Sequence, residues 1–324
     1  MIDLVLAHSP DPDDAFMWWP LTGKFDPDQA GDGPIQPDSP AILSPPALET
    51  GRFRFLALPA DIEVLNRRAA DRGDLDITAL SVRAWAGVAD RYTITRCGAS
   101  FGEGYGPKVV ARANAPAASD ADWLRRPETR IAVPGRRTTA FLVLSLLLGH
   151  GAAETRNARF IELPFDQVIP AVARGQADAG LVIHEGQLSF ADAGLRLIVD
   201  LGEWWRGETG GALPLGVNAI RRDLDARFGA GTLVEVSNLL ARSVAHSIER
   251  WDESVRYTLP FAAANARRAG GEPPTLDRVD RYCRMYVSAL TRDMGETGRS
   301  TIEALLSRGA DRGLCPKPRR LEVM

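Results

Sequence analysis

Asp178-Ala-Gly-Leu-Val-Ile-His-Glu-Gly-Gln-Leu-Ser-Phe190 is the stretch from which the fold of this chain is most readily inferred. Within it, residues 179–183 form a short apolar run, which predicts a buried strand. His184 comes next, at the carboxyl end of that strand, and ligands of open α/β sheets bind in the crevice beyond such ends. An imidazole also exchanges a proton near neutral pH. His184 is therefore our candidate catalytic base, and the alternative is a histidine that only packs or hydrogen-bonds in the core.

The composition indicates a globular protein without a nucleic-acid or zinc site. The 324 residues are 45% hydrophobic and 25% charged, which is typical of globular chains long enough for two domains. The net charge is −3 and the arginine pairs are scattered, so we expect no nucleic-acid partner. Three widely spaced cysteines, Cys97, Cys283 and Cys315, fit neither a disulfide framework nor a zinc site.

The N-terminus and the apolar segments predict no association with a membrane. The first ten residues, MIDLVLAHSP, lack the basic region and the long apolar region of a signal peptide. No uninterrupted apolar stretch approaches the ~18 residues that span a bilayer. We therefore expect a cytoplasmic protein that acts on a small molecule, and the sequence leaves the choice between a monomer and a homodimer open.

Strands and helices alternate along much of the chain, which predicts an α/β fold with two mostly parallel sheets flanked by helices. Three times a predicted strand leads through hydroxyl or acidic residues into a helix: at Ser9 to Asp14, at Ser81, and at Thr138-Thr139. A helix N-terminus presents free N–H groups and partial positive charge to a carboxylate or phosphate. These residues are candidate substrate contacts if the three units meet at one cleft. Otherwise they only cap their helices.

A series of short motifs covers nearly the whole chain. They are His8-Ser-Pro-Asp-Pro-Asp-Asp-Ala-Phe16, Ser81-Val-Arg-Ala-Trp-Ala86, residues 98–107, Pro134-Gly-Arg-Arg-Thr-Thr-Ala-Phe141, residues 178–190, Asp200-Leu-Gly-Glu-Trp-Trp205, Pro214-Leu-Gly216 and residues 286–298. In sequence and in order they resemble motifs of the 1,4-dihydroxy-6-naphthoate synthases, enzymes of the futalosine route to menaquinone. No single motif is very specific, so the resemblance depends on the whole series.

The resemblance implies a fold like that of the type II periplasmic binding proteins. Such a fold has two α/β lobes, a two-strand hinge and a ligand cleft between the lobes. Here one lobe would contain residues 1–112 and 214–324, and the other residues 113–213. The hinge strands would be residues 108–113 and 213–220.

The resemblance also implies an activity: a lyase that cleaves cyclic dehypoxanthinylfutalosine to 1,4-dihydroxy-6-naphthoate and a sugar-derived fragment, without a metal or organic cofactor. His184 occupies the position of the family's proposed base. The cleft hydroxyl groups of the family fall on Ser81 and Thr139, with Thr138 adjacent. Ser9 and Asp14 belong to the N-terminal motif. Together with backbone N–H groups, these residues would hold an aromatic carboxylate substrate.

Two features depart from the family's pattern. Asp11 and Asp13 stand where the family has Cys and Asn. Added carboxylates would repel an anionic substrate, unless they cap the helix or pair with an arginine such as Arg136 or Arg137. Residues 26–50, rich in proline and glycine, predict an irregular surface loop that is longer than the family needs. Either departure is compatible with a shifted substrate.

Other functions share this fold, because a fold does not fix an activity. The main alternative is a non-catalytic solute-binding protein for a small carboxylate, cytoplasmic or exported, but no secretion signal or lipobox cysteine is visible. A regulator's effector-binding part would need a DNA-binding helix-turn-helix, which the sequence does not show. A chorismate-dehydrating relative matches less well at Ile183-His184-Glu185. Gly98-Ala-Ser-Phe-Gly102 has the spacing of a nucleophile elbow but leads into a strand, so we interpret it as a cleft-lining or hinge loop.

Overall fold

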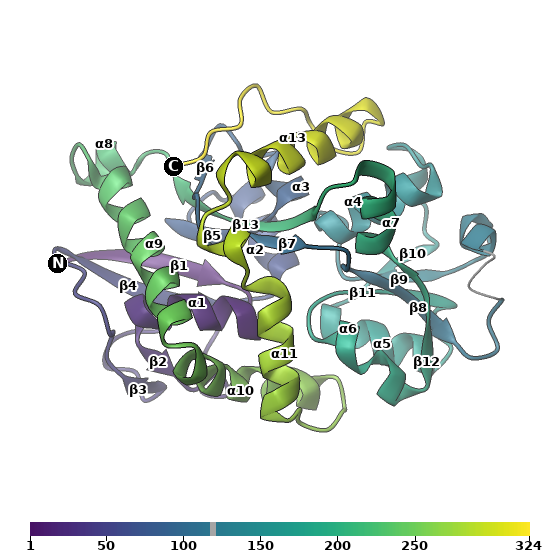
Figure 1. Ribbon diagram of the computed structural model, residues 1–324, viewed down its shortest axis with the longest axis horizontal. Coiled ribbons are helices and arrows are strands. Elements are labelled where there is room, and N and C mark those ends of the chain that lie inside the picture. The colour runs from purple at the N-terminus through teal and green to yellow at the C-terminus, as the bar shows by residue number, and fades with distance from the viewer. Residues whose placement is uncertain (117–120) are drawn as a thin grey trace.

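Two β-sheets with helices packed around them form the described part of the chain, residues 1–116 and 121–324 of this computed structural model (Figure 1). The first sheet has the strand order β4-β1-β5-β13-β6, with β7 paired to β13, and the second has the order β10-β9-β11-β8-β12. Strands β2 and β3 form a separate pair. The strands are β1 Ile2–His8, β2 Lys24–Phe25, β3 Ile42–Ser44, β4 Phe53–Pro59, β5 Ile77–Ser81, β6 Tyr92–Ile94, β7 Ser100–Gly102, β8 Lys108–Arg112, β9 Ile131–Val133, β10 Phe160–Glu162, β11 Ala179–Val182, β12 Leu195–Asp200 and β13 Leu213–Arg221.

Helices connect the strands and make up most of the C-terminal third. The α-helices are α1 Pro12–Thr22, α2 Ile62–Asp71, α3 Val82–Trp85, α4 Thr139–Leu148, α5 Phe165–Ala173, α6 Gly186–Ser189, α7 Leu201–Thr209, α8 Leu224–Phe228, α9 Thr232–Glu249, α10 Trp251–Arg268, α11 Leu276–Tyr286, α12 Ala289–Arg292 and α13 Gly295–Asp311. In Figure 1 helix α11 lies near the middle of the molecule, between the first sheet and helices α5 and α6 of the second half. The C-terminal helices thus approach both halves.

One inverted strand in each sheet makes the strand pairing mixed. Strand β1 is parallel to β4 and β5, whereas β13 is antiparallel to β5, β6 and β7. In the second sheet β9 is parallel to β10 and β11, whereas β8 is antiparallel to β11 and β12. The expected α/β fold is confirmed, but the pairing is not mostly parallel as expected. The reason is that β8 and β13 each enter their sheet from the other half, and so run against its remaining strands.

The two inverted strands are those expected to form the hinge, and each lies wholly within one sheet. Residues 108–112 form β8 of the second sheet, although the sequence analysis placed them in the first lobe. The chain crosses between the sheets just before each strand, at residues 103–107 and 210–212. These short connections, rather than the strands, are our candidate hinge.

An apolar core runs without interruption from the first half into the second. It includes Leu80 of β5 and Trp85 of α3 in the first half, and Phe141 of α4 and Leu181 of β11 in the second, all of them buried. Helix α4 contributes a large share, because nine of its ten residues are buried. The two halves are therefore joined by side-chain packing as well as by the chain.

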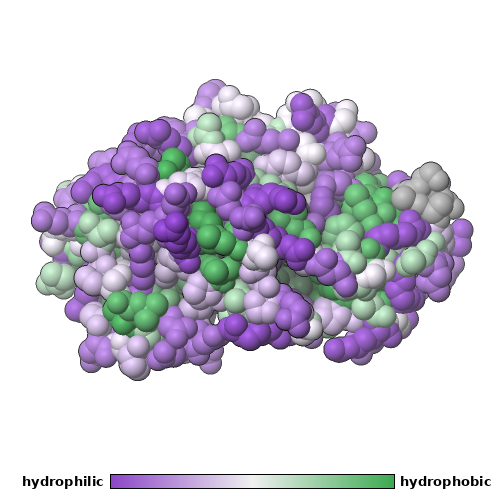
Figure 2. Space-filling model, turned by 60° about the horizontal axis from the view of Figure 1, so that its bottom comes forward, coloured by the Kyte–Doolittle hydropathy of each residue, from purple (hydrophilic) through white to green (hydrophobic). Residues whose placement is uncertain are grey.

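On the face shown in Figure 2, apolar residues form separate patches within a mainly hydrophilic surface. No helix of residues 1–116 or 121–324 has the length and apolar character needed to cross a bilayer. Residues 26–50 are irregular apart from β3, as expected.

Candidate active site

A cavity of about 680 Å³, its open mouth included, lies between the two halves. Its wall contains all six residues that the sequence singled out: Ser9, Asp14, Ser81, Thr138, Thr139 and His184. The first three lie at or beyond the carboxyl ends of β1 and β5, and the other three beyond those of β9 and β11. Since β1 and β5 are parallel neighbours, as are β9 and β11, the strand ends meet at one edge of each sheet. The three strand–helix units therefore converge on one cavity.

His184 is held from two sides. Its backbone is left-handed, with φ 56°, and no other non-glycine residue of the described ranges has positive φ. Its ring packs edge-on against Phe165, with 4.7 Å between ring centroids. Nδ1 contacts Asp11 Oδ2 as a hydrogen bond and ion pair, and Nε2 is buried without a hydrogen-bond partner among the described residues. Because Nδ1 faces a carboxylate, Nε2 is the nitrogen left to exchange a proton with a ligand.

Asp11 controls the charge of His184. Burial alone would lower the pKa of the imidazole, but the charge and hydrogen bond of Asp11 outweigh burial and raise the pKa to about 9. The charges of Glu185 and Asp13 act in the same direction. At neutral pH His184 is therefore mainly an imidazolium, and its basic form increases as the pH rises towards 9.

Three further carboxyl groups surround this pair, and burial favours their protonated forms. Burial, followed by the charge of Asp11, raises the pKa of Asp13 to about 6 and the pKa of Glu185 to about 7. Burial also raises the pKa of Asp14 well above its usual range. At neutral pH these three groups therefore carry less negative charge than ordinary carboxylates would, and the imidazolium offsets part of the remainder. The described residues contain no cluster arranged to bind a metal ion.

Two serine hydroxyl groups in the wall are free to donate a hydrogen bond. Ser9 Oγ is buried and has no partner among the described residues. Ser81 Oγ accepts from Asn66 Nδ2 at 3.1 Å, which leaves its own hydrogen available. Asp14 Oδ2 accepts from the backbone N–H of Ser9 at 2.8 Å, so this side chain shapes the loop that carries Ser9.

The two threonine hydroxyl groups already form hydrogen bonds with backbone groups. Thr138 Oγ1 donates to the carbonyl of Gly135 at 2.8 Å and caps α4 by accepting from the N–H of Phe141. Thr139 Oγ1 donates to the carbonyl of Leu215 at 2.6 Å. A hydroxyl has one hydrogen to donate, so neither group can donate to a ligand without giving up its present bond.

Arg136 and Arg137, the arginines considered as partners of Asp11 or Asp13, form ion pairs with other carboxylates. Arg136 pairs with Glu162, with 3.6 Å between Nε and Oε2, and Arg137 Nη2 lies 3.5 Å from an oxygen of Asp71. The Asp11 side chain also makes no capping hydrogen bond to α1. Neither of the two possibilities, a helix cap or an arginine pair, therefore holds for Asp11, because the loop after β11 brings the His184 imidazole to this side chain instead.

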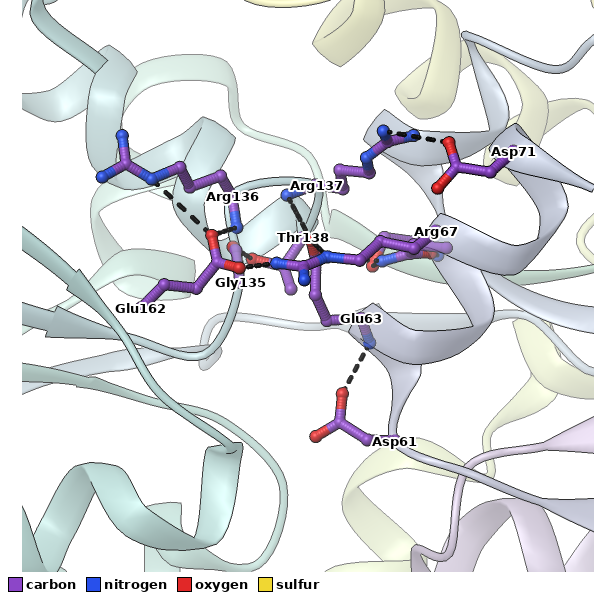
Figure 3. Close-up of polar contacts among 11 residues, drawn as sticks. Asp61, Glu63, Arg67, Asp71, Gly135, Arg136, Arg137, Thr138 and Glu162 are labelled. Atoms are coloured by element: carbon purple, nitrogen blue, oxygen red, sulfur yellow. Dashed lines mark hydrogen bonds and ion pairs between the residues drawn. The ribbon is translucent and has the colours of Figure 1, made fainter. Parts of the chain in front are cut away.

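Figure 3 shows these arginines in a polar network that joins α2 to the loop before α4. The buried carboxylate of Glu63 accepts from the backbone N–H of Arg137, at 3.1 and 3.3 Å to its two oxygens. Arg67, one turn further along α2, lies 3.3 Å from Glu63 and also reaches Glu162 of β10. The network thus links the two halves directly beside Thr138.

We expect Gly135→Ala to weaken this link between the halves. Gly135 has φ 146°, and a Cβ atom there would lie 2.4 Å from Cγ and 2.5 Å from Oε2 of Glu63. Glu63 would have to withdraw from the Arg137 N–H, and an unsatisfied buried polar group costs about 1–3 kcal/mol. Urea denaturation should therefore show a lower unfolding free energy. Gly33→Ala is the control, because a Cβ there meets nothing within 4 Å; equal midpoints for the two variants would contradict this account of Glu63.

Several wall residues were not predicted as contacts. Tyr282 and Tyr286 of α11 line the cavity, and the Tyr286 hydroxyl donates to Gln187 Oε1 at 2.9 Å. Asn218 of β13 and Ser100 of β7 complete this side, so Ser100 lies in a cleft-lining segment as interpreted. The spacing of four between the tyrosines places them on one helix face, but the same spacing is typical of any buried helix face.

Known proteins resemble this chain in sequence and in fold. The sequence model of a family described as Menaquinone biosynthesis matches residues 4–311. The 1,4-dihydroxy-6-naphthoate synthase of Thermus thermophilus is 35% identical over 322 residues, 99% of this chain and 99% of that protein. Its namesake from Streptomyces coelicolor is 32% identical over 316 residues, 97% and 95% of the two chains. The alkanesulfonate-binding protein of Xanthomonas axonopodis pv. citri has a similar fold, with a TM-score of 0.58, 16% identity and coverage of 100% and 98%.

Proposed function

This chain belongs to the menaquinone biosynthesis family, and from that membership we propose that it is a lyase that cleaves cyclic dehypoxanthinylfutalosine and releases 1,4-dihydroxy-6-naphthoate. The relatives that carry the synthase name match almost the whole chain, and thus both sheets and the cavity between them. The single observation that supports the proposal best is the imidazole of His184: the residue lines this cavity, and its buried Nε2 has no hydrogen-bond partner among the described residues.

We assign the role of general base to His184 Nε2. Forming the naphthalene ring of the product requires a proton to leave the substrate, and a positioned base typically contributes ~10²–10⁴-fold to such a step. The ring is restrained by Phe165 and by Asp11, so it needs little reorganisation before it reacts.

The substrate's carboxylate would be bound mainly by neutral donors. The cavity wall, taken over the described residues, contains no lysine or arginine. Ser9 and Ser81 have hydroxyl hydrogens to donate, so we assign the carboxylate to them. Thr138 and Thr139 would contribute the wall at the start of α4, where helix N–H groups favour an anion. Asp14 would act through the Ser9 loop that it holds.

The test is an assay of the purified full-length protein with cyclic dehypoxanthinylfutalosine. We expect catalytic release of 1,4-dihydroxy-6-naphthoate, identified by chromatography and mass spectrometry against an authentic standard. The alternative, a non-catalytic binding protein for a small carboxylate, predicts saturable binding without product. The fold alone does not separate these outcomes, since the alkanesulfonate-binding protein shares it. Binding without turnover would overturn the proposal.

A further inference from the structure

We infer that Asp11 is the positioning residue for His184: it fixes which imidazole nitrogen carries the proton and so leaves Nε2 as the basic atom. The inference rests on the proposed function, because it concerns how the proposed base is prepared. Asp11 stands where the family's pattern has cysteine. The inference therefore concerns a residue at which this chain departs from that pattern.

The contact between the two side chains joins the two halves of the molecule. Asp11 immediately precedes α1, which follows a strand of the first sheet, whereas His184 follows β11 of the second. The side chain of Asp11 is 4% exposed and that of His184 14%, so water competes little for the contact. The other oxygen of Asp11 has no hydrogen-bond partner among the described residues, and the side chain does not cap α1. Among the described residues, the His184 imidazole is therefore the group that the Asp11 side chain binds.

A carboxylate beside Nδ1 selects the tautomer of a neutral imidazole. The hydrogen on Nδ1 is donated to Asp11, so the lone pair of the neutral ring is on Nε2, which is buried in this cavity-lining residue without a hydrogen-bond partner among the described residues. Without Asp11 either nitrogen could hold the hydrogen, and the ring would keep its packing against Phe165 but lose the hydrogen bond that orients Nδ1. Because the pair spans both halves, the base is correctly prepared only while they are closed on each other.

Other acidic groups lie near His184 and act on it through their charge alone. Asp13 and Asp14 approach from the first turn of α1, Asp61 from the residue before α2, and Glu185 from the same loop, with Tyr282 of α11 beside the cluster. Their charges influence the titration of His184. None of them is hydrogen-bonded to the ring, so removing one of them should not change the tautomer. This difference separates positioning from a general effect of negative charge.

The experiment combines histidine nitrogen-15 NMR with kinetics on the wild type and Asp11→Asn. The chain has four histidines, and the His184 signal is identified by its loss in His184→Gln. In the wild type we expect a titration midpoint near 9 and the Nδ1–H tautomer above it. In Asp11→Asn the midpoint should fall by about two pH units or more, because burial then acts with less opposing charge. Turnover should fall by about 10²-fold or more with little change in KM.

The pH profile and two further variants complete the test. Since the neutral imidazole is the active form, wild-type kcat/KM should rise with pH until about 9, and the rise should end at lower pH in Asp11→Asn. Asp11→Glu should recover part of the lost turnover. Asp13→Asn, which removes a nearby carboxylate without touching the ring, should lower the midpoint less and keep the tautomer. An unchanged midpoint and tautomer in Asp11→Asn would overturn the inference.

The NMR result does not depend on the reaction, so the two proposals fail separately. If the wild type shows the expected titration but releases no product, the proposed function is wrong and the role of Asp11 in preparing the imidazole stands. If the wild type releases product while Asp11→Asn keeps its turnover and pH profile, the function stands and Asp11 is not a positioning residue.

Discussion

His184→Ala should reduce the release of 1,4-dihydroxy-6-naphthoate by about 10²–10⁴-fold, the range that a general base typically contributes. The loss should appear in kcat, because Nε2 acts on the reacting proton rather than on the bound carboxylate. His184→Gln should be equally inactive, since an amide can donate to Asp11 but cannot accept a substrate proton at neutral pH. Steady-state assays of the two variants beside the wild type measure this directly.

The control for this prediction is a histidine outside the cavity wall. His246 lies in α9 with its ring 5.5 Å from that of Trp19, and His246→Gln should keep wild-type turnover. Circular dichroism and thermal unfolding of each variant check that the fold is retained. A folded His184→Ala protein that keeps more than about a tenth of wild-type turnover would exclude general-base catalysis by this residue.

The position of the candidate site could be predicted because it follows from strand direction. Each of Ser81, Thr138 and His184 lies at or just beyond the carboxyl end of a predicted strand, and such ends meet at one edge of a sheet. The apolar run before His184 sets its place in the chain with little ambiguity. What the local pattern could not show was which sheet each strand joins, and therefore that residues 108–112 belong to the second half.

The partners of the charged side chains could not be predicted, because they depend on how the two halves meet. Asp11 and His184 are 173 positions apart in the sequence and pair between the two halves. The arginines of the loop before α4 instead form ion pairs with Glu162 and Asp71. Local sequence carries the preference of an aspartate for a helix start but not the competition from a distant imidazole. For the same reason the tyrosines of α11 carried no recognisable signal before that helix was placed against the cavity.

Gly202→Ala should cause a second large effect, a loss of folding stability. The substitution alters the place where the chain crosses between the sheets. A Cβ atom on Gly202 would lie 1.9 Å from the carbonyl oxygen of Tyr105 and 2.5 Å from the backbone nitrogen of Gly106. These are backbone atoms of the 103–107 connection, and the N–H of Leu201 donates to the carbonyl of Pro107 at 2.9 Å. The clash can be relieved only by moving the connection or the start of α7.

Overpacking against side chains typically costs about 1–3 kcal/mol, and backbone atoms yield less, so Gly202→Ala should destabilise the fold by about 3 kcal/mol or more. Gly207→Ala in the same helix is the matched control. That glycine is exposed and a Cβ there meets nothing within 4 Å, so alanine should stabilise the protein by up to ~1 kcal/mol. Urea denaturation of both variants measures the difference. Because the 103–107 connection is also the candidate hinge, any Gly202→Ala protein that folds should show altered turnover as well. Equal stability of the two variants would mean that α7 and the connection are not packed as described.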